Sequence, residues 1–460
     1  MSELMSILIP IVGPVHFIGI GGVGQRSAAE LLLAQGLRVT GSDVLDSPAL
    51  HSLTERGAQV VIGHATENLG GAQLVVVSSA VPESNPEIVE ARRRGIDVVK
   101  NAELERRIGL GRRTIAVAGT HGKTTTTSML AWIFSQARMD PTFIVGGEVR
   151  NLGVGGHAGA GPWFIVEADE YDRRFLSLDP WCAIITSLEA DHLDYYGSMD
   201  QLVDAFQQFV ARSPASGRVI VCADDPGAMA LTKAAAAPVE SYGIGPAAWQ
   251  AKGIEQAPDA TCFVVAKDGQ HVARCVMRVP GLHNVRNALA CFAAAATAGI
   301  ALDIVVAALA TFQGAGRRFE LNGEARGVAV LNDYGHLPAE VRVTIASARQ
   351  RYPGRRVWAV FQPHTYARTR LWMDEFAAAC READRCLIVG AYVPSGRESV
   401  QSDAETRELA AKIGVPYLAN RQELLPALFP ELRSGDVVLL VGAGDLYLAA
   451  EPLLQRLGAA

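Results

Sequence analysis

Seven consecutive residues in the first third of the chain combine glycine, lysine and hydroxyl side chains, which are the residue types that hold phosphate groups. They are Gly119, Thr120, His121, Gly122, Lys123, Thr124 and Thr125. Closely spaced glycines let backbone N–H groups wrap around phosphate oxygens, a lysine neutralises their charge, and a threonine hydroxyl binds the accompanying Mg²⁺. The loop is shorter than the general G-x-x-x-x-G-K-[ST] pattern, because Val117 stands where the first glycine would be. We predict that this loop binds ATP.

Carboxylates follow two apolar runs further along the chain. The run from Trp163 leads into Glu167 and a cluster of acids, and the run from Cys182 leads into Asp191 and His192. Acids just past a buried strand are the usual ligands of Mg²⁺ in a nucleotide-binding domain. The sequence therefore predicts two metal positions, with Glu167 as the first-choice ligand. A structural role explains His192 as well as metal binding does.

A second glycine-rich segment lies near the N-terminus, where an apolar run leads into G-x-G-x-x-G at Gly19, Gly21 and Gly24. Asp43 comes 19 residues after Gly24, where dinucleotide-binding units place an acid against the ribose. We expect a nucleotide or its diphosphate here. The expected contacts are Gly21, Gly22, Val23, Gly24 and Asp43. A NAD-dependent dehydrogenase is the alternative interpretation of this segment, although it leaves the later lysine-containing loop unexplained.

Three other polar side chains fall in this N-terminal part. Ser78 and Ser79 follow the apolar run 74–77, and open α/β sheets bind ligands where their strands end. His64 follows Gly63 in a loop. It either lines the pocket or is merely solvated, and the sequence alone favours neither.

Polar side chains of a different kind occur later in the chain. His336, His364 and Arg368 follow predicted strands and together would form a cationic pocket for a carboxylate, whereas each one alone is better explained as an ordinary loop residue. Arg317 follows a glycine-rich hinge, from which it could reach a phosphate. Asn284 and Asn287 begin an alanine-rich helix, where they either cap the helix or hydrogen-bond a purine edge.

These side chains can lie close together in space if they follow strands of parallel sheets, because the carboxyl ends of parallel strands lie at the same edge of a sheet. Apolar runs predict strands at 115–118, 328–331, 357–361, 386–389 and 437–441, and helical spacing is found at 128–134 and 338–352. We predict an α/β protein of three domains. These are an N-terminal Rossmann-like domain over 1–111, a central phosphate-loop ATPase domain with a mostly parallel sheet over 112–314, and a C-terminal Rossmann-like domain over 315–460.

Composition excludes several classes of protein. The 460 residues are 49% hydrophobic and 20% charged, with a net charge of −6, which argues against nucleic-acid binding. Seven cysteines form no C-x-x-C pair, so reduced thiols are expected rather than a zinc site. No run is long enough to span a membrane, and residues 1–14 lack the features of a signal peptide. We expect a cytoplasmic protein, as a monomer or a weak homodimer.

Taken in order, the motifs resemble those of the Mur ligases over nearly the whole chain. The matching segments are Gly19–Gly24, Gly119–Thr125, Glu167–Glu170, Glu189–His192, Gly281–Asn284 with Asn287, Gly316–Phe319, Asp333–His336, and Gln362–His364 with Arg368. The resemblance implies a ligase that uses ATP to phosphorylate the lactyl carboxylate of UDP-N-acetylmuramate. The amine of L-alanine would then attack the acyl phosphate. By this likeness the N-terminal loop holds the UDP group rather than NAD.

The resemblance also implies roles for individual residues. Thr124 and Glu167 would bind one Mg²⁺ and His192 the other, while Asn284 and Asn287 would contact adenine. The amino acid and the growing end of the product would be held by Tyr334, His336, His364 and Arg368. The residues expected to act in catalysis are Lys123, His192, Arg317, His336 and Arg368.

Four positions depart from the usual pattern or distinguish branches of the family. Leu337 replaces a second histidine, Ser187 replaces an asparagine, and Phe206 stands where other Mur ligases carry a carbamylated lysine. Phe206 matches the branch that adds L-alanine, whereas Tyr171 is more similar to the ligase that recycles a murein tripeptide onto the same nucleotide sugar. That recycling ligase is therefore the nearest alternative. A folate polyglutamyl ligase is more distant, because that family usually has asparagine where His121 stands.

Overall fold

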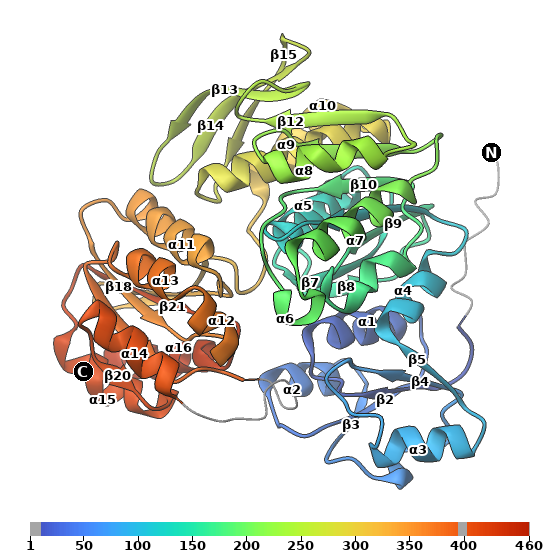
Figure 1. The fold of residues 1–460 in the computed structure, drawn as a ribbon, viewed down its shortest axis with the longest axis horizontal. Coiled ribbons are helices and arrows are strands. Elements are labelled where there is room, and N and C mark those ends of the chain that lie inside the picture. Colours follow the sequence, from blue (N-terminus) through green and yellow to red (C-terminus); the bar gives the residue numbers. More distant parts are fainter. Residues whose placement is uncertain (1–10, 394–402, 460) are drawn as a thin grey trace. The chain divides into compact units, whose positions relative to one another are not determined.

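The computed structural model describes residues 11–393 and 403–459 (Figure 1). Most of the segment that we interpreted as lacking a signal peptide lies outside the described residues. The chain forms two compact units. The first comprises the described residues up to Ala315, apart from 256–261 and 279–281. The second comprises Gln256–Thr261, Val279–Gly281 and the described residues from Gly316 onward.

The first sheet contains five parallel strands in the order β3-β2-β1-β4-β5 (blue in Figure 1). Its strands are β1 (Val15–Ile18), β2 (Val39–Asp43), β3 (Gln59–Ile62), β4 (Leu74–Val77) and β5 (Asp97–Lys100). Its helices are α1 (Val23–Ala34), α2 (Pro48–Glu55), α3 (Pro86–Arg93) and α4 (Asn101–Gly109). The strands that follow β1 are added first on one side of it, as β2 and β3, and then on the other side, as β4 and β5. Open α/β sheets bind ligands at the point where the strand order reverses in this way, and here that point lies between the loops that follow β1 and β4.

Alternation along the strands places apolar residues on both faces of this sheet. Phe17 packs in one cluster with residues of α1, α2 and α4, whereas Ile18 packs in another with Ile88 of α3. The larger cluster continues into the central part of the chain, where it includes Phe164 and Phe206. This shared apolar core explains why the first two sheets belong to one unit.

The second sheet has ten strands in the order β15-β14-β13-β12-β11-β10-β6-β9-β7-β8. Pairing is parallel from β13 to β7 and antiparallel between β7 and β8, which confirms the mostly parallel central sheet. The strands are β6 (Arg113–Ala118), β7 (Thr142–Val149), β8 (Val154–His157), β9 (Trp163–Glu167), β10 (Cys182–Ile185), β11 (Arg218–Cys222), β12 (Val239–Gly243), β13 (Trp249–Gln256), β14 (Thr261–Lys267) and β15 (Gln270–Met277). The helices are α5 (Lys123–Gln136), α6 (Leu193–Tyr196), α7 (Met199–Ala211), α8 (Pro226–Ala230), α9 (Leu282–Thr297) and α10 (Leu302–Thr311).

The third sheet lies in the second unit, in the order β16-β17-β21-β18-β19-β20. All its pairs are parallel except β16 with β17. The strands are β16 (Glu320–Ala325), β17 (Val328–Asp333), β18 (Arg356–Phe361), β19 (Arg385–Val389), β20 (Tyr417–Leu418) and β21 (Asp436–Val441). The helices are α11 (Pro338–Arg351), α12 (Tyr366–Leu371), α13 (Met373–Cys380), α14 (Ala404–Ile413), α15 (Leu424–Leu428) and α16 (Ala450–Ala459). The predicted α/β class, with three sheets in sequence order, is confirmed.

Two expectations from composition can be compared with the structure. Over the described ranges 11–393 and 403–459, no helix combines the length and the apolar character needed to cross a membrane. The seven cysteines are free thiols, and all except the partly exposed Cys262 are buried. The prediction of unpaired, mostly buried thiols is therefore confirmed.

Glu87, in the first turn of α3, is a fully buried carboxylate. Burial raises its pKa, but hydrogen bonds from His16, Ser42 and Asn68 outweigh burial and lower the pKa to about 2. The ionised form is thus favoured by folding. Glu87 stabilises the protein above the unfolded-state pKa of 4.5, and this contribution is lost as the pH falls from there towards 2.

We expect the thermal stability of the wild type to fall more steeply than that of Glu87→Gln between pH 5 and pH 3. The shift from 4.5 to about 2 corresponds to at most about 3 kcal/mol of unfolding free energy. Differential scanning calorimetry of both proteins across this range measures the difference. A gap in Tm between the two proteins that stays constant from pH 6 to pH 3 would contradict an ionised, stabilised Glu87.

Candidate active site

The seven-residue glycine loop joins β6 to α5, as the sequence indicates. Gly119 and Gly122 have φ values of +132° and +80°, and a side chain on Gly119 would collide with Thr186. The end of β10 supports the loop, because His121 N donates to Ser187 Oγ at 3.0 Å and Thr120 N donates to Ser187 O at 3.1 Å. The residue that replaces the usual asparagine, Ser187, therefore fixes the loop backbone at the start of a 14-residue helix.

Lys123 is held inside this loop by a buried carboxylate. Its Nζ donates to Glu170 Oε1 at 2.9 Å, to Glu170 Oε2 at 2.8 Å and to Gly119 O at 2.6 Å. Burial alone would lower the pKa of Lys123, but Glu170 and Asp169 outweigh burial and raise it. Burial raises the pKa of Glu170 to about 7 against the opposing attraction of Lys123. The ammonium group of Lys123 thus stays charged beside the Glu170 carboxylate, which accepts from it with both oxygens.

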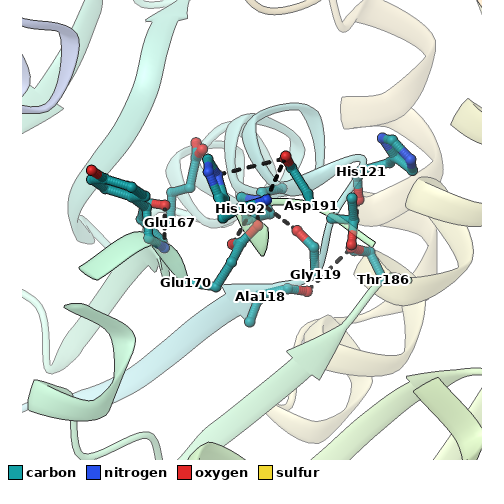
Figure 2. A network of polar contacts seen from close by, with 12 residues as sticks. Ala118, Gly119, His121, Glu167, Glu170, Thr186, Asp191 and His192 are labelled. Atoms are coloured by element: carbon teal, nitrogen blue, oxygen red, sulfur yellow. Dashed lines mark hydrogen bonds and ion pairs between the residues drawn. The ribbon is translucent and has the colours of Figure 1, made fainter. Parts of the chain in front are cut away.

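Of the metal-binding residues proposed from the sequence, Glu167 ends β9 and His192 follows β10, on either side of β6, whereas Thr124 lies in the first turn of α5. Thr124 Oγ1 donates to Glu167 Oε1 at 3.1 Å, and Gly146 N donates to Glu167 Oε2 at 2.8 Å. These contacts bring together Thr124 and Glu167, as the sequence grouped them. Figure 2 shows both strand ends gathered around the loop.

His192 belongs to a second group, whose other members are Glu170 and Asp191. One possible ligand atom from each of the three lies within 4.8 Å of the others. Two carboxylates supply the oxygen ligands that Mg²⁺ prefers, so the donor set fits this ion. Glu170 and Asp191 were not predicted individually as ligands, although both lie in the acidic runs that follow β9 and β10.

Asn284 and Asn287 lie within α9, which begins at Leu282, so neither occupies the capping position. Both are buried, and Asn287 Nδ2 donates to Asn284 Oδ1 at 3.1 Å. Asn287 also lies against the phosphate loop, with Oδ1 2.7 Å from where a Cβ on Gly122 would be. The capping interpretation is wrong. Asn287 lies beside the phosphate loop, and Asn284 is hydrogen-bonded to Asn287.

In the N-terminal sheet, the predicted residues surround the loop between β1 and α1. Asp43 Oδ2 accepts from Gly21 N at 2.8 Å, so the acid fixes the glycine loop that precedes Val23 and α1. Ser78 follows β4 and its Oγ accepts from Ala80 N at 3.4 Å, while Ser79 is exposed. His64 is only 16% exposed, and its Nδ1 is 2.9 Å from Ser42 Oγ. The interpretation of His64 as merely solvated is therefore wrong.

Arg174 connects the N-terminal sheet to the central sheet, and it was not predicted from the sequence. Its NH1 donates to Asp169 Oδ2 at 3.0 Å, in the acidic run after β9, and its NH2 donates to Glu105 Oε1 of α4 at 3.3 Å. NH2 also lies 3.5 Å from where a Cβ on Gly24 would be. Burial raises the pKa of Glu105 to about 7 even though Arg174 opposes the shift. No local pattern marks the contact with Glu105, because the two residues lie 69 positions apart in the sequence.

The second unit brings together the residues proposed to bind the amino acid. Arg368 is 8% exposed, and its NH1 is 2.9 Å from His364 Nδ1. The His364 ring lies 5.7 Å from that of His336, which lies 5.6 Å from that of Tyr334. Glu340 Oε2 is 3.4 Å from His336 Nδ1, so the cluster is less uniformly cationic than the sequence indicated.

Arg317 is also held within the second unit. Its NH2 donates to the carbonyl oxygens of Gly442 and Gly444, each at 2.9 Å, and its guanidinium lies 4.1 Å from the centre of the Tyr447 ring and 4.8 Å from that of Tyr334. Burial lowers the pKa of Arg317. These hydrogen bonds involve NH2, and the guanidinium has further N–H groups at Nε and NH1 for the phosphate contact that we predicted.

Two of the departures noted in the sequence are packed in apolar cores. Leu337 is buried, so the position of the missing histidine serves packing in this chain. Phe206 is fully buried in α7, with its ring centre 5.0 Å from that of Phe175. Because position 206 is a buried phenylalanine, this chain has no lysine there that could be carbamylated.

The fold and the site define a nucleotide-dependent α/β enzyme with a phosphate loop and two groups of metal-compatible side chains. Three family models match the chain: the Mur ligase family catalytic domain over residues 14–112, the Mur ligase middle domain over 117–295, and the Mur ligase glutamate ligase domain over 317–444. The chain belongs to the Mur ligase family, whose members are ATP-dependent ligases.

Full-length relatives and solved structures agree with this assignment. The chain is 41% identical to the UDP-N-acetylmuramate–L-alanine ligase of Solidesulfovibrio magneticus, over 96% of this chain and 98% of the relative. It is 40% identical to that of Renibacterium salmoninarum, over 98% of each chain. The crystal structure of UDP-N-acetylmuramate-alanine ligase from Thermotoga maritima matches with a TM-score of 0.83 at 27% identity, over 96% and 98% of the two chains. A murein peptide ligase from Psychrobacter arcticus matches with a TM-score of 0.77 at 28% identity, over 98% and 99%.

Proposed function

We propose that this enzyme joins L-alanine to the lactyl carboxylate of UDP-N-acetylmuramate, with cleavage of ATP to ADP and phosphate. The observation that carries the proposal is full-length similarity, at about 40% identity, to relatives that bear this activity in their names. The phosphate loop and the adjacent carboxylates supply the chemistry that such a reaction needs. The product is a precursor for peptidoglycan synthesis. A dehydrogenase is not supported by any of these similarities.

The reaction must activate a poor electrophile. A carboxylate oxygen of the sugar attacks the γ-phosphorus of ATP, the bond to ADP breaks, and an acyl phosphate results. The amine of L-alanine then attacks the acyl carbon, phosphate leaves, and the amine loses a proton. The first step brings two anions together, so positive charge at the phosphate loop is the main requirement.

Lys123 meets this requirement. In our proposal its ammonium group exchanges the Glu170 carboxylate for β- and γ-phosphate oxygens when ATP binds. The Glu170 carboxylate released in this way is then available to a metal ion, together with Asp191 and His192. Asn284 and Asn287 would contact the adenine from beside the loop.

We propose that Thr124 and Glu167 hold one Mg²⁺ and that His192, with Glu170 and Asp191, holds a second. When bound, Mg²⁺ offsets negative charge on the phosphate oxygens. Arg317 remains a proposed phosphate ligand. Its NH2 donates to the carbonyl oxygens of Gly442 and Gly444, and Nε and NH1 are further donors of the same guanidinium.

The N-terminal sheet would bind the UDP group. Gly21, Gly22, Val23 and Gly24 precede or begin α1, whose N-terminus suits a diphosphate. We assign the remaining contacts with the nucleotide sugar to Asp43, His64, Ser78 and Ser79.

A substrate comparison separates this function from its nearest alternative, tripeptide recycling. The protein is incubated with UDP-N-acetylmuramate, ATP and either L-alanine or the murein tripeptide, and phosphate release is followed. We expect release with L-alanine. Release with the tripeptide alone would assign the enzyme to the recycling branch.

In the second unit, we assign the carboxylate of the amino acid to Arg368, supported by His364, His336 and Tyr334. Arg368→Lys is expected to raise the KM for L-alanine about 10-fold or more, because lysine cannot form the paired hydrogen bonds of a guanidinium with a carboxylate. The KM for UDP-N-acetylmuramate should stay unchanged. Arg370→Lys, an exposed position on the same helix α12, is the control. Equal KM values for L-alanine in the two variants would remove Arg368 from the amino-acid site.

The proposal also covers the cellular location, the oligomeric state and the domain boundaries of the protein. We place the enzyme in the cytoplasm, as a monomer or a weak homodimer, with domain boundaries at residues 111/112 and 314/315. Sedimentation velocity over a range of protein concentrations tests the oligomeric state. Limited proteolysis that cuts first near these boundaries would support the division of the chain.

A further inference from the structure

The Glu87 carboxylate lies at the centre of a hydrogen-bond network in the N-terminal sheet. Its Oε2 accepts from Ser42 Oγ at 2.6 Å and from His16 Nε2 at 3.3 Å. Its Oε1 accepts from Asn68 Nδ2 at 2.7 Å and from Ala65 N at 3.1 Å. A carboxylate offers about four acceptor positions, so these contacts use the acceptor capacity of the group. Two of them hold the loop that carries His64.

The network also decides which nitrogen of His64 carries a proton. A serine hydroxyl has one hydrogen, and that of Ser42 is donated to Glu87. Ser42 Oγ can therefore only accept from His64 Nδ1, which lies 2.9 Å away. In a neutral imidazole, a proton on Nδ1 leaves a lone pair on Nε2. His64 is thus held in the form whose Nε2 accepts a hydrogen bond.

The position of His64 suits contact with a ligand. It follows β3, next to the end of β2 that carries Ser42 and Asp43, and both strands end at the edge where open α/β sheets bind ligands. Within residues 11–393 and 403–459, the protein contacts of the His64 ring involve Nδ1. The ring is partly exposed, so Nε2 is the nitrogen that a ligand can use.

We propose that Glu87 is a positioning residue for nucleoside recognition, which acts through Ser42 to hold His64 with Nε2 ready to accept a hydrogen bond from the uridine part of the nucleotide sugar. This inference rests on the proposed function for the identity of the ligand. The donor is either the N3–H group of uracil or a ribose hydroxyl. If it is N3–H, the same arrangement disfavours cytidine, whose N3 has a lone pair instead of a hydrogen.

Steady-state kinetics test the role of Glu87. Glu87→Gln and Ser42→Ala are expected to raise the KM for UDP-N-acetylmuramate roughly 10-fold, because one well-oriented hydrogen bond is lost. The kcat and the KM for ATP should change less than about twofold, because the phosphate loop is untouched. Glu90→Gln, which makes the same chemical change on helix α3 in a residue paired with Arg93 and Arg94 rather than with Ser42, is the matched control. Unchanged KM values in Ser42→Ala, which keeps the other three contacts of Glu87, would overturn the proposal.

Nitrogen NMR of the histidine rings tests the tautomer independently of activity. We expect His64, assigned with His64→Gln, to carry its proton on Nδ1 at pH 8 in the wild type and to populate both tautomers in Ser42→Ala. A proton on Nε2 in the wild type would overturn the proposal.

Calorimetry with nucleotides identifies the donor. UDP, N3-methyl-UDP, 2′-deoxy-UDP and 3′-deoxy-UDP are each titrated into the wild type and into His64→Ala. The analogue that lacks the donor should bind more weakly than UDP to the wild type but as well as UDP to His64→Ala. Equal binding of all four nucleotides to the wild type, or no binding of UDP, would refute the inference. Because UDP binding is measured without ligation, failure of the L-alanine reaction together with this nucleotide pattern would refute the proposed function alone.

Discussion

Lys123→Ala is expected to lower kcat about 10³-fold or more while leaving the Kd for UDP-N-acetylmuramate unchanged. Lys123 is the cation within the phosphate loop, and its ammonium group is already held at the loop by Gly119 O and Glu170. Its removal leaves the attack of one anion on another without this charge. The nucleotide sugar is assigned to the separate N-terminal sheet, so its binding should persist.

Single-turnover phosphate release measures the chemical step, and calorimetry with UDP-N-acetylmuramate measures binding. Lys100→Ala is the control, because Lys100 forms an ion pair with Asp172 but lies outside the loop. Alanine at position 123 also leaves Glu170 buried without its cation, so the Tm of both variants must be compared with that of the wild type. Equal loss of nucleotide-sugar binding and turnover in a folded Lys123→Ala protein would show that the two nucleotide sites are assigned wrongly.

Asp191→Asn is expected to lower kcat about 100-fold and to raise the Mg²⁺ concentration for half-maximal activity about 10-fold. Asp191 lies in the group with Glu170 and His192, and asparagine keeps its size while removing the charge. Excess Mg²⁺ should restore part of the activity, because the remaining oxygen and nitrogen atoms are still in place. Titration with Mn²⁺, followed by electron paramagnetic resonance, reports metal binding without turnover.

Asp172→Asn is the matched control for this substitution, since it makes the same chemical change in a residue that pairs with Lys100 and lies outside the metal group. An exposed ion pair of this kind contributes little to stability. If Asp191→Asn and Asp172→Asn bind Mn²⁺ equally well, Asp191 is not a metal ligand.

Individual segments could be interpreted from the sequence because each one combines a buried strand with the residues that follow it. The β6 strand, the glycine loop and α5 are consecutive in the chain, so their spacing alone indicates a phosphate site. The same applies to Glu167 after β9 and to Asp191 and His192 after β10. In parallel sheets, strand ends on a common edge meet in space, and the resemblance to the Mur ligases added the pairing of Thr124 with Glu167.

Tertiary structure alone decided the contacts between distant segments. Glu87 meets Ser42 from 45 positions away, and Arg174 meets Glu105 from 69 positions away, without any repeating pattern that marks either pair. A buried charge needs a partner wherever packing places it. How helices pack on sheets cannot be predicted from the spacing of residues within one segment, so the partners of buried charges cannot be predicted from that spacing either. The sequence by itself determined the motifs, their order and the fold class. Only the folded chain decided that Glu170 holds Lys123, that the two asparagines lie beside the phosphate loop rather than at a cap, and which nitrogen of His64 is left to accept a hydrogen bond.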